Sequence, residues 1–146
     1  MSYQWLSMRI TEENDRRKRE EEILERLPRA LEEVHQALAG CVENYQQAFG
    51  PEAAELQSLA TRIRVTVREE LDGRWEQRSR VEVVTDASLP GFKIDRGDGS
   101  QPLIIEVGML PGDKLYFRDH DKDQYVTMEE LTRRILDRAL FPKLKE

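Results

Sequence analysis

The sequence predicts an α+β fold: a long N-terminal amphipathic helix packed on an antiparallel β-meander of about five strands, closed by a C-terminal helix. Two observations predict this class. Apolar residues recur at alternating spacings of three and four before Gly50-Pro51, and short alternating apolar runs separated by turn residues follow it. At 146 residues, the chain is expected to form a single domain, 1–146, around one core.

The first helix is expected over residues 11–49, with Thr11 as a candidate N-cap. A proline at position 28 predicts a kink, because proline removes a backbone donor and crowds the preceding turn. Residues 14–22 are almost wholly charged and have no apolar face. This end of the helix is therefore expected to project into solvent or to meet a partner.

An apolar stripe begins at Leu24 and follows a 3.5-residue period, which places its members on one side of the helix. Two interpretations are open. The stripe lies on the chain's own sheet, or it forms a coiled-coil seam with a second copy. The short length of the stripe and its internal proline favour the first interpretation. The members of this core or dimer seam are Leu24, Leu27, Leu31, Val34, Leu38, Cys41 and Tyr45.

Residues 52–71 fit either a helix or a strand. Their leucines have helical spacing, but residues 61–67 alternate and are rich in β-branched side chains, which favour strands. We therefore expect a short helix or irregular stretch at 52–58 and a strand at about 60–70.

Asp72-Gly73 predicts a hairpin between this strand and residues 75–85. A three-residue loop at 72–74 is favoured over a two-residue turn, because it keeps the apolar residues of both strands on one face. The expected pairs are Leu71 with Trp75, Val65 with Val81, and Ile63 with Val83.

The rest of the chain predicts a meander that extends the sheet over residues 60–126. Short apolar runs separated by turn residues indicate the further strands. A capping box formed by Thr127 and Glu130 predicts the start of the last helix, over residues 128–141. The expected strands lie at residues 92–94, 103–107, 114–118 and 124–126.

Composition narrows the classes of function. The net charge of −6 argues against bulk attraction to nucleic acid or to anionic lipid. No apolar run approaches the roughly 18 residues of a membrane span, and residues 1–10 lack the continuous apolar stretch of a secretory segment. Cys41 is the single cysteine, so an internal disulfide is impossible. These features together predict a cytoplasmic protein.

Residues 119–130 resemble the calcium-binding loop of EF-hand proteins. The resemblance implies Ca²⁺ as an alternative to the favoured expectation of no cofactor. Three departures oppose it: Gln124 stands where the loop needs glycine, the preceding residues predict a strand instead of a helix, and the sequence has no second loop to pair with it. The favoured alternative is an aspartate-rich turn before a capped helix. The implied metal ligands are Asp119, Asp121, Asp123 and Glu130.

The outward face of the predicted hairpin is unusually basic for an acidic protein. An acidic peptide, a phosphate group or an acidic helix of another chain is a suitable partner for such a face. The alternative is a solvated surface on which arginines pair with glutamates across the strands. The candidate partner-binding residues are Arg62, Arg64, Arg68, Arg78 and Arg80.

Nothing in the sequence predicts a catalytic site. His35 and Cys41 are six residues apart on one helix, so they face different directions. The leading hypothesis is a non-catalytic interaction or assembly module of the adaptor or chaperone-like kind. Its expected partner is another protein or a second copy of the chain, which would make a homodimer. A calcium- or ligand-binding domain using residues 119–130 is the alternative, and a small enzyme of unknown chemistry is the third hypothesis.

Overall fold

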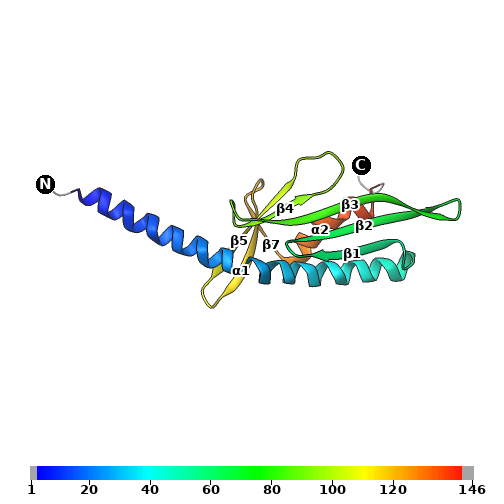
Figure 1. The fold of residues 1–146 in the computed structure, drawn as a ribbon, viewed down its shortest axis with the longest axis horizontal. Helices are drawn as coiled ribbons and strands as arrows, with labels where there is room; N and C mark the ends of the chain where they lie inside the picture. The colour runs from blue at the N-terminus through cyan, green and yellow to red at the C-terminus, as the bar shows by residue number, and fades with distance from the viewer. Residues whose placement is uncertain (1–2, 143–146) are drawn as a thin grey trace.

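A computed structural model describes residues 3–142 and confirms the α+β class. Helix α1 (Gln4–Phe49) precedes an antiparallel sheet, and helix α2 (Met128–Leu140) follows it, as Figure 1 shows. The sheet has seven strands where about five were expected. Within residues 3–142, neither helix combines the length and the apolar character needed to cross a membrane.

The strands form an unbroken meander, because each strand pairs antiparallel with the next in the order β1 to β7. Turns of two to four residues join the neighbouring strands, except for the seven-residue loop 96–102 between β4 and β5, so no crossover connection is needed. The strands are β1 (Ala54–Leu59), β2 (Arg62–Leu71), β3 (Arg74–Asp86), β4 (Gly91–Asp95), β5 (Leu103–Leu110), β6 (Lys114–Asp119) and β7 (Gln124–Val126).

Strand β1 occupies residues for which a short helix or irregular stretch was expected, so that prediction is wrong. Six residues of β1 pair with β2, from Ala54 opposite Val67 to Leu59 opposite Arg62. This stretch has no decisive local preference, and pairing with the edge of β2 decides its structure.

Helix α1 begins seven residues earlier than expected, at Gln4 instead of Thr11. Thr11 is not an N-cap. It lies inside the helix, and its hydroxyl donates to the carbonyl of Ser7 at 3.1 Å. The helix is continuous through Pro28. Figure 1 shows its axis changing direction between the part that projects and the part that lies beside the sheet.

The β2–β3 hairpin has a tighter turn than expected. Leu71 pairs with Arg74, so the prediction of a three-residue loop and of a Leu71–Trp75 pair is wrong. Asp72 and Gly73 occupy the two turn positions with φ angles of 53° and 78°. Positive angles at both positions are typical of a type I′ turn, which Asp-Gly forms at little cost.

The predicted register in the buried half of this hairpin is confirmed. A register shift between Val67 and Arg68 leaves Arg78 as an extra residue on β3. Such a β-bulge offsets the pairing by one residue, so a two-residue turn followed by a bulge gives the register that a three-residue loop would give. The confirmed pairs are Val65 with Val81 and Ile63 with Val83.

One hydrophobic core lies between the sheet and the two helices. It buries the apolar stripe of α1, so the stripe packs on the chain's own sheet and is not an open seam for a second copy. Leu24 and Cys41 are only partly buried, while Ala30 and Val42 join the buried set. The predicted stripe residues that are buried are Leu27, Leu31, Val34, Leu38 and Tyr45.

The predicted capping box of α2 is confirmed. The amide of Glu130 donates to the Thr127 hydroxyl at 3.1 Å, and the amide of Thr127 donates to the Glu130 carboxylate at 3.2 Å. These bonds satisfy backbone donors that the first turn of a helix leaves free.

Candidate interaction surface

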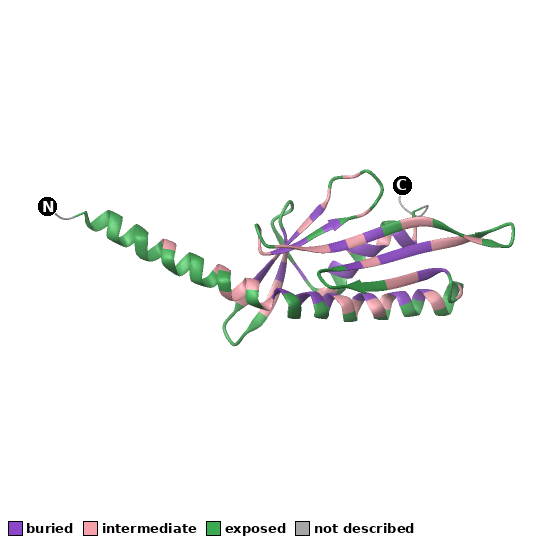
Figure 2. Ribbon diagram, viewed as in Figure 1, coloured by how far each residue is buried: buried purple, intermediate pink, exposed green. Residues whose placement is uncertain are grey.

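The part of α1 from Gln4 to Arg26 projects from the body of the protein. It contains no buried residue, and the first buried position is Leu27. Figure 2 shows this part as almost wholly exposed, extending well beyond the sheet. Apart from Ile23 and Leu24, which pack partly on the core, and Arg26, which pairs with Asp113, the projecting part lacks the tertiary packing that normally stabilises an amphipathic helix.

The end of α1 farthest from the sheet carries exposed apolar side chains. Monomeric proteins rarely expose such residues as a group. We call this group the apolar tip: Tyr3, Trp5, Leu6, Met8 and Ile10, with exposed fractions of 60%, 66%, 42%, 58% and 52%. It accounts for half of the large hydrophobic residues that are exposed in residues 3–142.

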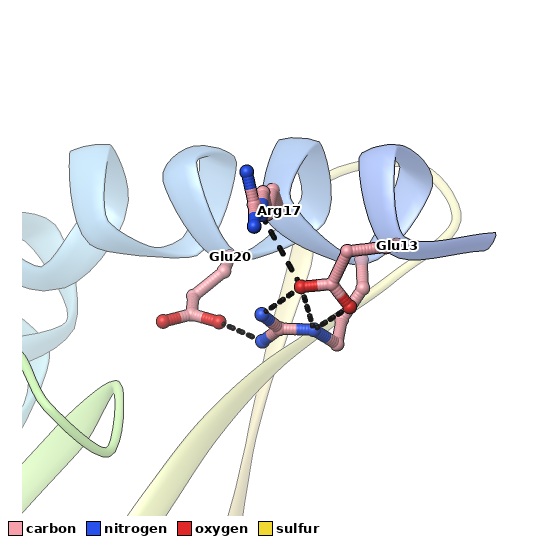
Figure 3. A network of polar contacts seen from close by, with 4 residues as sticks. Glu13, Arg17 and Glu20 are labelled. Atoms are coloured by element: carbon pink, nitrogen blue, oxygen red, sulfur yellow. Dashed lines mark hydrogen bonds and ion pairs between the residues drawn. The ribbon is translucent and has the colours of Figure 1, made fainter. Parts of the chain in front are cut away.

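Between the tip and the sheet lies a charged segment, residues 12–22, held by ion pairs along the helix (Figure 3). The Glu13 carboxylate accepts hydrogen bonds from Arg16 at 2.6 Å and from Arg17 at 3.2 Å. Arg16 also donates to Glu20 at 2.6 Å. The contacts follow the spacings of three and four at which side chains on a helix meet.

These contacts change the acidity of Glu13. Hydrogen bonds from Arg16, and secondly from Arg17, lower the pKa of the Glu13 carboxyl from 4.5 to about 2. The same pairing raises the pKa of Arg16. Both groups are therefore charged at neutral pH, and the projecting helix presents fixed charges along its surface.

A shallow apolar recess lies where α1 reaches the sheet. It has a volume of about 370 Å³. We call it the basal recess: it is lined by Leu24, Leu27, Pro28 and Leu31 of α1, together with Ala60 and Ala87 from two turns of the sheet. It lies on the same helix that carries the apolar tip.

The β5–β6 hairpin contacts α1 near this recess. Arg26 forms an ion pair with Asp113 at 3.0 Å, and Arg29 donates to the Asp113 carbonyl at 3.3 Å. Both arginines lie close to the point where the helix leaves the sheet, so the contacts constrain the direction in which the helix projects.

The predicted arginine face is largely paired with acidic groups. Arg62, Arg64 and Arg80 surround the Glu82 carboxylate at 3.4, 3.0 and 3.8 Å. Arg68 lies 3.6 Å from Glu55. The contacts of Arg62, Arg64 and Arg68 are the cross-strand pairs of the alternative interpretation, and Arg80 contacts Glu82 within strand β3.

Arg78 does not belong to this face, and its assignment to it is wrong. The β-bulge turns Arg78 toward the last turn of α2, where it donates to the carbonyls of Leu140 at 2.7 Å and Ala139 at 3.1 Å. The neighbouring Ser79 hydroxyl also donates to the Ala139 carbonyl, at 2.8 Å. A cation at this position satisfies carbonyls that a helix leaves free at its end.

The four predicted calcium ligands share no common partner. Asp119 is 1% exposed; its carboxylate binds Arg134 and accepts the amides of Asp121 at 3.1 Å and Lys122 at 3.2 Å. Asp123 pairs with Arg118. Glu130 caps α2, and Asp121 is exposed.

This arrangement is an aspartate-rich turn between strands β6 and β7. Within residues 3–142, no group of three or more His, Cys, Asp or Glu residues lies where it holds one metal ion.

Sequence reasoning missed the apolar tip. The signal was present, because the spacing of three and four that defines the stripe continues upstream of Leu24 to Ile10, Leu6 and Tyr3. The charged residues between them interrupt the apolar pattern. Comparison with known proteins adds nothing to this site, since no family model, curated protein or solved structure matches the chain.

Proposed function

We propose that this protein is a non-catalytic protein-interaction module whose docking element is the projecting part of α1. The apolar tip carries the proposal, with Trp5 and Met8 more than half exposed on a helix that the sheet does not cover. Exposed apolar groups of this kind are characteristic of surfaces that another molecule covers.

The charged segment supports the same proposal. Its ion pairs along the helix keep the backbone helical where no sheet supports it. The tip is thereby held away from the body of the protein, and a partner reaches it without rearranging the core.

A cytoplasmic location is part of the proposal. It is supported by the single Cys41, which is partly buried in the core and has no cysteine in the chain with which to form a disulfide. Calcium binding has weaker support, because Asp119 and Asp123 already pair with Arg134 and Arg118.

The proposal is tested with the full chain carrying Trp5→Gln, Leu6→Gln and Ile10→Gln together. Affinity-tagged wild type and variant are purified from the native cell, and the size of the complexes is measured. The variant should lose complexes that the wild type forms, because glutamine removes the apolar contact.

The matched control is Leu71→Gln, which removes a leucine that is 46% exposed at the far hairpin. This variant should retain the wild-type complexes. Identical complexes in wild type, tip variant and control would place any interaction elsewhere and reject the tip as the docking element.

A further inference from the structure

We propose that the projecting helices of two copies of this chain pair antiparallel about a two-fold axis at Asp15. In this pair the seam side of each apolar tip, with Tyr3 and Leu6, lies against the base of the other copy's projecting helix. The inference rests on the proposed function and deepens it, since it names a second copy as the partner of the tip.

The seam of this pair follows from the spacing along α1. Upstream of Leu24, steps of three and four pass through the charged Glu20, Arg17 and Glu13 and then reach the apolar Ile10, Leu6 and Tyr3. Such a period places residues on one side of a helix. We call this set the outer seam: Tyr3, Leu6, Ile10, Glu13, Arg17, Glu20, Leu24 and Leu27.

An antiparallel pair centred on Asp15 matches the outer seam with itself. A residue n positions before Asp15 faces the residue n positions after it in the second copy. Leu6 then faces Leu24, and Glu13 faces Arg17. Seam residues alternate between positions followed by a step of three and positions followed by a step of four. Each facing pair joins one position of each kind, as the layers of an antiparallel coiled coil do.

The charges of the segment favour this direction. Acidic residues dominate positions 12–15, and positions 16–19 are all basic. In the antiparallel pair, the acidic turn of each copy lies level with the basic turn of the other, and Glu13 faces Arg17 of the second copy. A parallel pair would place each basic run beside its identical copy, and like charges at that distance repel.

The ends of the pair have apolar contacts on both sides. Tyr3 of one copy comes level with Leu27 of the other, which is buried and lines the basal recess, so the accessible apolar contact there is the half-buried Leu24 at the rim of the recess. The recess of about 370 Å³ is open to a side chain from outside, and its lining is mainly apolar. The pair therefore covers seam residues of the tip and the exposed rim of the recess in a single contact.

Two residues of the tip lie off the seam. Trp5 and Met8 lie on the other side of the helix from Leu6 and Ile10, because they are out of step with the spacing of three and four. They remain exposed in the antiparallel pair. This asymmetry provides a matched control: Met8→Gln should keep the dimer, and Leu6→Gln should lose it.

Charge exchange gives the sharpest test, measured by analytical ultracentrifugation of the purified full chain. Wild type should have twice the monomer mass of 17.1 kDa. Glu13→Arg and Arg17→Glu should each be monomeric, because position 13 of one copy faces position 17 of the other. An equimolar mixture of these variants should form a heterodimer, since every facing pair is then oppositely charged.

Orientation is tested by disulfide formation in a Cys41→Ser background. Leu6→Cys combined with Leu24→Cys should cross-link two copies on oxidation. Leu6→Cys alone should not, because the two Leu6 positions are 18 residues apart along the antiparallel pair, or about 27 Å. Cross-linking by Leu6→Cys alone would indicate a parallel pair and overturn the inference.

A monomeric wild type at high concentration also overturns the inference. If the complexes from the native cell still depend on the tip, the proposed function stands and the partner is another protein. If those complexes are also independent of the tip, both proposals fail. Circular dichroism of each variant confirms that the fold is retained, since the substituted positions 6, 8, 13 and 17 are not buried.

Discussion

At the scale of single residues, Arg78 contributes to the junction of three elements. It belongs to strand β3, donates to the last carbonyls of α2 at Leu140 and Ala139, and lies 3.4 Å from the Tyr45 hydroxyl of α1. The bulge that makes it an extra residue also directs its side chain to this junction. An irregularity in the strand thus places a cation at the end of a helix.

We expect Arg78→Ala to lower the free energy of unfolding by about 1–3 kcal/mol, because it removes charge-assisted hydrogen bonds to partly buried carbonyls. Urea denaturation measures this change. The control is Arg80→Ala, which removes an exposed side chain 3.8 Å from Glu82 and should change stability by less than about 1 kcal/mol. Equal effects of the two variants would contradict a specific role for Arg78 at the end of α2.

At the scale of elements, α1 is one helix with two kinds of support. From Leu27 onward, its buried stripe packs on the sheet. Before that point the helix depends on contacts between its own side chains, of which the cluster around Glu13 is the most connected. The same backbone structure thus results from packing in one half and from local pairing in the other.

The local pairing predicts a pH dependence. Because the pKa of Glu13 is about 2 instead of 4.5, its ion pairs stabilise the helix above pH 4.5 and are lost as the pH falls toward 2. Titration of the Glu13 carboxyl by NMR should therefore show a midpoint near pH 2. Arg16→Gln should raise this midpoint more than Arg17→Gln does, and a wild-type midpoint at 4.5 would show that the pairs do not form in solution.

At the scale of the whole molecule, a single core supports an element that extends far beyond it. The sheet, α2 and the second half of α1 form the body, and the projecting half of α1 carries apolar side chains that the body does not cover (Figure 2). Under the proposed function, stability and interaction belong to different parts of one helix. Substitutions in the tip should leave the core unchanged.

Hydrogen exchange tests this division. In a dilute sample, amides of residues 30–45 should exchange slowly, because opening them requires disruption of the core. Amides of residues 5–20 should exchange faster, since only local contacts protect them. Raising the protein concentration should slow exchange in residues 5–20 alone if copies pair there. Uniform protection along α1 at every concentration would contradict the division.

Patterns with a strong local or periodic signal were predictable from the sequence. The period of the stripe determined which side of α1 is apolar, and Thr127 with Glu130 determined where α2 begins. The matching of apolar faces determined that Val65 pairs with Val81. In each case the decisive interactions are between near neighbours, or follow from the need to bury one face.

Other features depended on contacts between distant residues, which the tertiary structure alone decided. Strand β1 exists because β2 offers it an edge, and Arg78 leaves the arginine face because a bulge turns it toward α2. The sequence determined that the apolar stripe must be shielded from water along its length. Only the structure decided that the sheet ends near Leu24, which leaves the apolar tip exposed.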